Sequence, residues 1–371
     1  MAIESIVFWQ DALSIHQAPL VSAAAELTSA NIYVVVESAG VGGRSTQGWT
    51  RPDYGRATLV EGVDQHQAQT ISSDIGPSSA NIVTGLGVYP VIKSATAELL
   101  RRNATVLFQS EGWDNRGLKG KGRSFRYRHR RPLLNGHEKS ALLAMGQAGV
   151  EKFVQAGYEA EKVHEFGYFT ELVVDADSGC ARDGAIYVGS LTARKNVPEV
   201  INGYLISNEI SRLTIVGTGP QEEDLKNQVP TDQHVEFRGT IHHSSVPEII
   251  KQHEVLVLAS LFDGWGAVVN EALGVGTPVV CSAAVGAGAL LDRGETFRGG
   301  VYKEGSAESL ARKIDETVLL CRESLGANTA ISEWAEENIA PEVGANYLLE
   351  LIDWVESDRV HGSKAPRAPW A

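Results

Sequence analysis

Sulfur-containing residues are scarce in this chain. Its 371 residues include three cysteines, Cys180, Cys281 and Cys321, and two methionines. No two cysteines form a CxxC pair, so the sequence predicts neither a disulfide framework nor a zinc site of the common spacing. This pattern favours a reducing compartment, and we expect a cytoplasmic protein.

Long apolar runs are also missing. A membrane-spanning helix needs roughly 20 consecutive apolar residues, and no stretch of this chain approaches that length. The first residues, MAIESIVFWQDALSIHQAPL, contain no basic leader ahead of an apolar core. We therefore expect a soluble protein, peripheral at most to the inner face of the cytoplasmic membrane.

Basic residues are fewer than acidic ones. Lys and Arg number 33 against 46 Asp and Glu, which gives a net charge of -13 and disfavours nucleic acid as a partner. A hydrophobic content of 43% is ordinary for a soluble α/β protein. The length predicts two domains.

Short apolar runs alternate with helical spacing along most of the chain. From residue 184 onward the expected strands are 185–189, 213–217, 235–239, 254–260 and 278–282. The first half gives weaker strands at 5–9, 31–38, 81–85 and 104–110, a long helical region at 139–158 and a short strand at 162–169. Continuous apolar strands separated by helices predict parallel sheets covered on both faces.

The segment VDADSGCARDG (174–184) lacks periodicity and marks the expected boundary between domains. We predict an N-terminal domain over 1–175 and a C-terminal domain over 176–340. The fold class is α/β, with two Rossmann-like parallel-sheet domains facing each other across a cleft. The triplet DAD at 175–177 has the DxD form of some metal sites, but it lies in the expected linker and such triplets are frequent by chance.

Two acids stand eight positions apart in FDGWGAVVNEALGVGTPVVCS, residues 262–282. Eight helical residues span about 12 Å, broadly the length of a diphosphate between a ribose and a sugar. Asp263 and Glu271 could therefore accept hydroxyls from the two ends of a nucleotide-sugar, with backbone N–H groups facing the phosphates. A helix cap at Asp263 and a solvated Glu271 explain the spacing equally simply.

This run resembles the E-x7-E motif, EGFG…EAxAxGxPVV, of the retaining glycosyltransferases of family 4, which have the GT-B fold. Asp263 stands in place of the first Glu. The resemblance covers about residues 184–335 and includes YVGSLTARKNVPEVI, LTIVGTGPQEEDL and VEFRGTIHHSSVPEII. It implies that a C-terminal helix within 341–371 packs back on the N-terminal domain.

The resemblance also implies roles for residues. Asp263 would hold hydroxyls of the donor sugar, from closer than a Glu would, and Glu271 would hold the ribose. Arg194 and Lys195 would neutralise the departing diphosphate, which a metal does in other transferases, so we expect no metal and no cofactor. Further contacts to the donor are expected from Gly189, Gly264, Trp265, Gly266, Gly217, Thr240 and Ile241, with His242 and His243 near the base.

The segment 116–131, RGLKGKGRSFRYRHRR, holds eight Arg or Lys residues and no acid. We expect a basic loop here that binds a glycan or lipid-pyrophosphate-linked acceptor, or an anionic membrane surface. A merely solvated loop is the alternative, and nucleic acid is disfavoured. Glu111 or Asp114 could assist the acceptor hydroxyl, although Glu111 could equally pair with nearby arginines. Asp11 and His16 are lesser candidates for acceptor contact.

The predicted activity is that of a metal-independent retaining hexosyltransferase. It would move a hexosyl unit from a nucleotide-sugar to a glycan or lipid-linked oligosaccharide in bacterial surface polysaccharide or lipopolysaccharide synthesis. A UDP-sugar is favoured and GDP-mannose is possible. The alternatives are a nucleotide-sugar 2-epimerase of the same fold and a non-catalytic nucleotide-sugar-binding scaffold.

Overall fold

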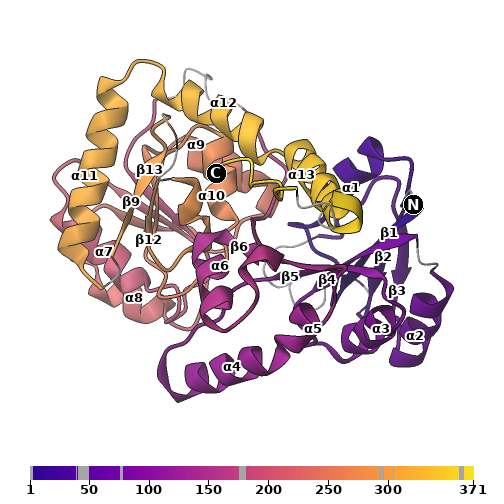
Figure 1. The fold of residues 1–371 in the computed structure, drawn as a ribbon. Helices are drawn as coiled ribbons and strands as arrows, with labels where there is room; N and C mark the ends of the chain where they lie inside the picture. Colours follow the sequence, from indigo (N-terminus) through magenta and orange to yellow (C-terminus); the bar gives the residue numbers. More distant parts are fainter. Residues whose placement is uncertain are drawn as a thin grey trace. The chain divides into compact units, whose positions relative to one another are not determined.

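The computed structural model describes residues 3–38, 40, 50–75, 78–174, 181–291, 294, 296–303, 305–358 and 363–371. The chain divides into two compact units (Figure 1). Unit 1 holds residues 1–170 and 341–369 with Ala371, and unit 2 holds residues 171–340 with Trp370. The triplet at 175–177 lies outside the described residues.

Unit 1 is built on a seven-stranded parallel sheet of order β3-β2-β1-β4-β5-β6-β7. Its strands are β1 (Ser5–Gln10), β2 (Asn31–Val36), β3 (Thr58–Glu61), β4 (Ser79–Thr84), β5 (Thr105–Ser110), β6 (Ser140–Met145) and β7 (Val163–Phe166). The order of strands reverses between β1 and β4. In open parallel sheets, ligands bind beyond the carboxyl ends of the strands at such a point.

The helices of unit 1 cover its sheet. They are α1 (Ala18–Leu27), α2 (Gln65–Asp74), α3 (Pro90–Arg101), α4 (Gly117–Arg130), α5 (Pro132–Asn135), α6 (Gly146–Gln155), α13 (Pro341–Asp353) and the π-helical η5 (Trp354–Asp358), with a 3-10 turn η2 (Ala160–Lys162). The C-terminal α13 packs on α1, and the Tyr347 hydroxyl donates to the Glu165 carbonyl at 2.9 Å. The C-terminal helix therefore lies in unit 1.

Two expectations about the first half are wrong. Residues 140–145 form the strand β6, and a helix begins only at Gly146. Every residue of β6 is buried, so its apolar run carries no period that separates a strand from a helix. The basic segment is not a loop, because residues 117–130 form α4. Two strands were not predicted from the sequence: the four-residue β3 and, in unit 2, β13 (Gly299–Tyr302).

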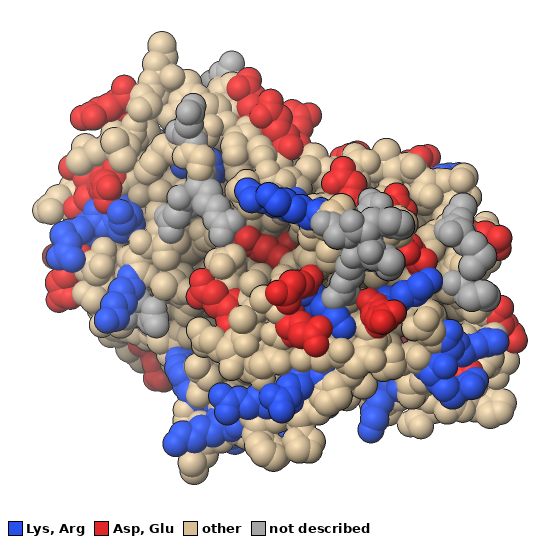
Figure 2. All heavy atoms as spheres, viewed as in Figure 1, with Lys and Arg blue, Asp and Glu red and all other residues tan. Residues whose placement is uncertain are grey.

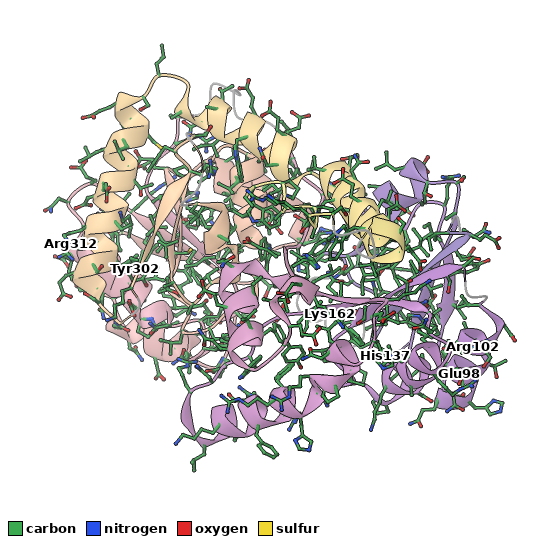
Figure 3. The ribbon with its side chains drawn as sticks, viewed as in Figure 1. Glu98, Arg102, His137, Lys162, Tyr302 and Arg312 are labelled. Atoms are coloured by element: carbon green, nitrogen blue, oxygen red, sulfur yellow. The ribbon has the colours of Figure 1, made fainter. Side chains whose placement is uncertain are left out.

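Lys162 anchors the end of α5 (Figure 3). Its side chain is almost wholly buried, and its ammonium donates to the carbonyls of Leu134, Asn135 and His137 at 3.0, 3.2 and 2.9 Å. The last carbonyls of a helix have no partners within the helix, so a cation there satisfies them. This contact fixes the α4–α5 segment beside the sheet of unit 1.

Unit 2 is built on a six-stranded parallel sheet of order β10-β9-β8-β11-β12-β13. Its other strands are β8 (Ala185–Val188), β9 (Leu213–Val216), β10 (Val235–Phe237), β11 (Val255–Leu258) and β12 (Val279–Ser282). All five strands expected in this half are present. The order reverses between β8 and β11, which places the switch point of unit 2 between these strands.

The helices of unit 2 lie between successive strands and at its end. They are α7 (Val197–Ile206), α8 (Glu222–Gln228), α9 (Val246–Lys251), α10 (Val268–Gly274), α11 (Ala307–Glu323) and α12 (Ala327–Ile339), with 3-10 turns η3 (His243–Ser245) and η4 (Gly286–Leu290). The helix α11 packs on α7, and α12 packs on α10. Glu199 in α7 accepts hydrogen bonds from the Tyr302 hydroxyl and the Gly305 N–H, at 3.0 and 2.9 Å, and so ties α7 to the end of β13.

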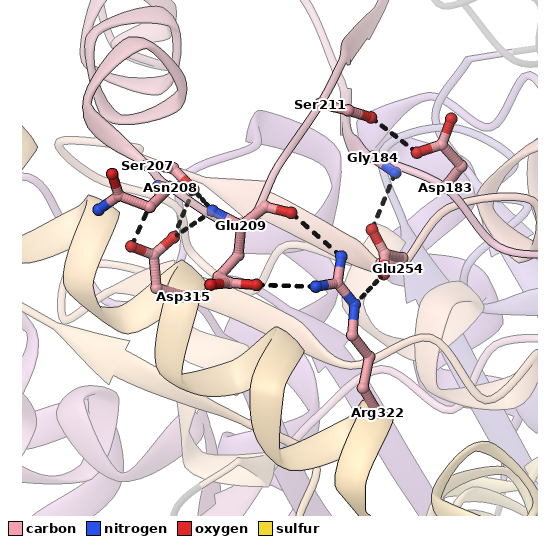
Figure 4. Close-up of polar contacts among 9 residues, drawn as sticks. All are labelled: Asp183, Gly184, Ser207, Asn208, Glu209, Ser211, Glu254, Asp315 and Arg322. Carbon is pink, nitrogen blue, oxygen red and sulfur yellow. Dashed lines mark hydrogen bonds and ion pairs between the residues drawn. The ribbon is translucent and has the colours of Figure 1, made fainter.

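An ionic network lies at the amino ends of the strands β8 and β11 in unit 2 (Figure 4). Arg322 on α11 donates to Glu254 at 2.7 Å and to Glu209 at 2.8 Å. Glu254 also accepts from the Gly184 N–H at 3.1 Å. Because Gly184 and Glu254 directly precede β8 and β11, the network lies at the sheet edge opposite the carboxyl ends, where ligands of such sheets bind.

We expect Glu254→Gln to lower the free energy of unfolding by about 1–2 kcal/mol, because it removes the charge from a largely buried acceptor of two hydrogen bonds. Arg312→Gln is the matched control, since Arg312 is exposed on α11. Chemical denaturation measures both variants, and equal stability of the two would contradict the role given to Glu254.

Candidate active site

Three loops meet beyond the carboxyl ends of β8, β11 and β12 in unit 2. The Leu261 N–H donates to the Arg194 carbonyl at 2.9 Å, which joins the loop after β11 to the loop after β8. The backbone N–H of Asp263 donates to the Ala284 carbonyl at 2.9 Å. The backbone carbonyl of Asp263 accepts from the Gly286 N–H at 3.1 Å. Backbone hydrogen bonds on both sides therefore fix the position of Asp263 beside the switch point.

The side chain of Asp263 contacts both basic residues of the predicted site, Arg194 and Lys195. Its Oδ2 pairs with the Lys195 Nζ, and its Oδ1 lies 3.6 Å from Nη1 of Arg194, which also donates to the Phe262 carbonyl at 2.8 Å. The Asp263 and Lys195 side chains are only 12% and 15% exposed, whereas that of Arg194 is 46% exposed. The cluster carries one net positive charge, and most of its accessible surface belongs to Arg194.

The glycines around Asp263 allow the loops to lie close together. Gly266 has a φ of 94°, and a Cβ there would lie 3.0 Å from the Val285 side chain. A Cβ on Gly286 would lie 2.3 Å from the Gly264 carbonyl oxygen. Larger residues at 266 and 286 would push the loops apart, and with them Asp263.

Trp265 lies in the core of unit 2. Its side chain is fully buried, its indole N–H donates to the Asn270 side chain at 2.9 Å, and its ring packs against Trp370. The expected contribution of Trp265 to donor binding is thereby limited to its backbone. The role of the indole is to hold the loop against α10.

Glu271 lies on α10, and the residue as a whole is half-buried. Among the described residues, its carboxylate has no hydrogen-bond or ion-pair partner. Burial raises the pKa of Glu271 to about 8, so this carboxyl group is largely protonated at neutral pH. A protonated carboxyl group can donate one hydrogen bond and accept others, which suits the hydroxyls of a sugar ring.

The glycines at the ends of β8 and β9 form a close backbone contact. Gly217 has a φ of 129°, and a Cβ there would lie 2.0 Å from the Gly189 carbonyl oxygen. Only glycine fits this position. Further along the same sheet edge, Thr240 is exposed after β10, with its hydroxyl 3.1 Å from that of Thr218, and Ile241 is half-buried.

Unit 1 has its own polar cluster beyond the carboxyl ends of its strands. Glu111, after β5, accepts a hydrogen bond from the Tyr168 hydroxyl at 2.9 Å, and the Tyr168 ring stacks on His16 with centroids 5.8 Å apart. Tyr168 was not among the residues predicted from the sequence, because it follows a strand and carries no motif. Asp114 is engaged by Arg116 at 2.9 Å, which lowers the pKa of Asp114 to about 2.

A cluster of metal ligands is not found in the part of the chain that the structure describes. There, no group of three His, Cys, Asp or Glu side chains lies close enough together to hold a metal ion.

Residues 182–318 match a protein family described as "Glycosyl transferases group 1". The match lies within unit 2 and covers about a third of the chain, so unit 2 is similar to the glycosyltransferases of group 1. An uncharacterized glycosyltransferase of Methanocaldococcus jannaschii is 30% identical over 106 residues, 27% of each chain. The alpha-D-kanosaminyltransferase of Streptomyces kanamyceticus is 26% identical over 238 residues, 57% of each chain. The chain thus matches between about a quarter and somewhat more than half the length of these relatives.

The solved structures extend the likeness to both units. Anabaena HepE in complex with UDP superposes with a TM-score of 0.71 at 14% identity, over 93% of this chain and 98% of that one. The same protein with UDP-glucose gives a TM-score of 0.68 at 15% identity over the same shares. The two parallel-sheet units are those of the GT-B fold.

The raised pKa of Glu271 predicts a pH-dependent stability. Between about 4.5, the ordinary value, and about 8, the folded protein binds more protons at this site than the unfolded chain. The contribution of Glu271 to stability therefore falls as pH rises through this window and levels off above it. Glu271→Gln removes the effect.

We expect the unfolding free energy of the wild type, relative to Glu271→Gln, to fall by up to a few kcal/mol from pH 5 to pH 8, since one pKa unit corresponds to about 1.4 kcal/mol. Thermal or chemical unfolding of both proteins across this range measures the difference. A difference independent of pH would show that Glu271 is ionised in the folded protein.

Proposed function

We propose that this chain is a retaining hexosyltransferase that uses a UDP-sugar donor, bound beyond the carboxyl ends of the strands in unit 2. The observation that carries the proposal is the cluster of Asp263, Lys195 and Arg194, in the same unit as Glu271, whose carboxyl group has no hydrogen-bond or ion-pair partner in the described part of the chain. The match of residues 182–318 to group 1 supports a glycosyltransferase, and the UDP and UDP-glucose held by HepE favour uridine. GDP-mannose remains the second candidate donor.

The charges of the cluster suit a diphosphate. Asp263 neutralises Lys195, while Arg194 presents the larger exposed surface. An incoming diphosphate would contact Arg194 first and then share Lys195 with Asp263. Its negative charge grows as the glycosidic bond breaks, so cations held in place by the protein stabilise the leaving group more than the bound donor. Under this proposal the basic pair supplies the positive charge and no metal is required.

The two carboxyl groups would then bind the two sugar rings of the donor, one each. Asp263 would accept hydroxyls of the hexose, and the neutral Glu271 would hydrogen-bond the ribose. The C1–O bond to the diphosphate breaks as the acceptor oxygen forms its bond to C1 on the same face. The acceptor's proton passes to a departing phosphate oxygen. The product retains the configuration at C1.

The acceptor would bind unit 1, where Glu111 is the preferred assisting group. Glu111 is exposed, and Tyr168 orients one of its oxygens. Asp114 is a weaker candidate because Arg116 engages both its oxygens. A hydroxyl of a glycan or lipid-linked oligosaccharide in bacterial surface polysaccharide or lipopolysaccharide synthesis is the acceptor we propose.

Variants of the two acids separate the halves of the donor site. Glu271→Ala should weaken binding of both UDP and the UDP-sugar by roughly 10- to 100-fold, because a hydrogen-bonding group to the ribose is lost. Asp263→Asn should leave UDP affinity within a few-fold and lower kcat by roughly 100- to 1,000-fold, because it weakens an electrostatic contact near the reacting sugar.

Titration calorimetry with UDP and turnover of UDP-glucose or UDP-galactose with and without a glycan acceptor measure these effects. Acceptor-dependent release of UDP with an α-linked product supports the transferase. Inversion of the donor sugar at C2 without an acceptor would identify a 2-epimerase, and tight donor binding without turnover would identify a scaffold. If no nucleotide-sugar stabilises the wild type against heat, the proposed donor site is wrong.

A matched pair tests the acceptor side. Glu111→Gln should lower kcat by roughly 100-fold while UDP affinity is unchanged, as expected for a carboxylate that orients the acceptor hydroxyl. Asp114→Asn is the control and should lower kcat less than about threefold, since only its pair with Arg116 is affected. The reverse ranking of the two variants would assign the role to Asp114.

A further inference from the structure

The helix α4 has an outer surface that the proposed chemistry does not use. Seven of its fourteen residues are cationic or histidine, and another cation stands at each end. In Figure 2 a row of Lys and Arg side chains follows the position that α4 has in Figure 1. Within the described ranges, no helix combines the length and apolar character needed to cross a bilayer.

One face of α4 is anchored to unit 1. The Tyr127 ring stacks on Trp113 with centroids 4.4 Å apart, and the Trp113 indole donates to the Ser124 hydroxyl at 2.8 Å. Gly120 is buried, and a Cβ there would lie 2.1 Å from the backbone of Asn115. These positions, 120, 124 and 127, are three and four residues apart and so form one stripe along the helix.

The opposite face bears two large apolar side chains that are exposed. Leu118 is 86% exposed and Phe125 is 67% exposed. They are seven residues apart, two helical turns, and therefore point to the same side. His129, one turn further, stacks on Phe125 with centroids 5.2 Å apart, which extends the ridge. We call Leu118, Phe125 and His129 the outer ridge.

Exposed cations border the outer ridge on both sides. Lys121 and Arg128 lie along one side at helical spacing, and Lys119 and Arg126 lie along the other. None of these four has an ion-pair partner among the described residues. A central apolar ridge with cations on both flanks lets the ridge enter an apolar layer while the ammonium and guanidinium groups stay at its charged border.

We infer that α4 docks this protein on the surface of an anionic lipid bilayer, with the outer ridge in the interface and its flanking cations at the lipid headgroups. A dissolved polyanion would use the cations but would give Leu118 no apolar environment, so the exposed leucine favours the bilayer. The inference goes beyond the proposed function and stands without it. It predicts that the acceptor is presented at a membrane surface.

The full-length protein should co-sediment with vesicles of phosphatidylcholine and phosphatidylglycerol at low salt, and not with vesicles of phosphatidylcholine alone. Arg126→Glu with Arg128→Glu should lower the partition coefficient roughly tenfold or more, because each cation near an anionic surface contributes a several-fold factor. Leu118→Ser with Phe125→Ser should lower it roughly tenfold, because both apolar side chains leave the interface.

Two matched controls change charge and apolarity elsewhere. Arg312→Glu with Lys364→Glu reverses two exposed cations, and Leu319→Ser with Leu325→Ser removes two exposed leucines of unit 2. The partition coefficient of both variants should stay within about twofold of the wild-type value. This change is smaller than the several-fold loss expected when one cation is removed from the membrane-binding surface. Thermal stabilisation by UDP in every variant tests the donor site separately, so failure of either proposal is distinguishable from failure of the other.

Three results would overturn the inference. The wild type could fail to bind anionic vesicles at low salt. Leu118→Ser with Phe125→Ser could bind as well as the wild type. The protein could bind single-stranded RNA or soluble polyphosphate as tightly as vesicles, with no effect of the two apolar substitutions. The last result would reassign α4 to a soluble polyanion.

Discussion

The contact between Asp263 and Lys195 is the interaction on which the candidate site depends. It joins the loop after β8 to the loop after β11 across the switch point of unit 2. Both side chains are largely buried, so each would be costly to hold there without the other. The same pair balances the charge that a diphosphate would meet, which couples the stability of the loops to the binding of an anion.

Close backbone packing supports that contact. Gly217 against the Gly189 carbonyl, and Gly286 against the Gly264 carbonyl, leave no room for a Cβ. Trp265 fills the space beneath, where its indole is bonded to Asn270. A loop held from below by a buried ring and from the side by backbone contacts can keep a carboxylate in one place without help from a ligand.

Unit 1 differs from unit 2 in how its polar groups are distributed. Its polar cluster of Glu111, Tyr168 and His16 is small, and its most unusual surface is the helix α4. The inner stripe of α4 is fixed by Trp113 and Tyr127, so the outer ridge is presented on a rigid support. The contacts on the inner side of α4 therefore hold the helix in place, while Leu118 and Phe125 on the opposite side stay exposed.

The sequence by itself determined the parallel-sheet architecture, the strands β8 to β12 and the loop that carries Asp263. Buried parallel strands are continuous apolar runs, and glycines at their ends are local signals that need no tertiary contact. The strand β6 and the helix α4 were misread because burial on both faces removes the period of a strand, and a run of charges conceals the inner stripe of a helix.

Only the tertiary structure decided the rest. It placed the Trp265 ring in the core, paired Asp263 with Lys195, brought Tyr168 to Glu111 and left Glu271 without a partner among the described residues. Each of these depends on residues that are distant in sequence and meet through packing. The residue types are visible in the sequence, but burial and distance set their charge and their contacts.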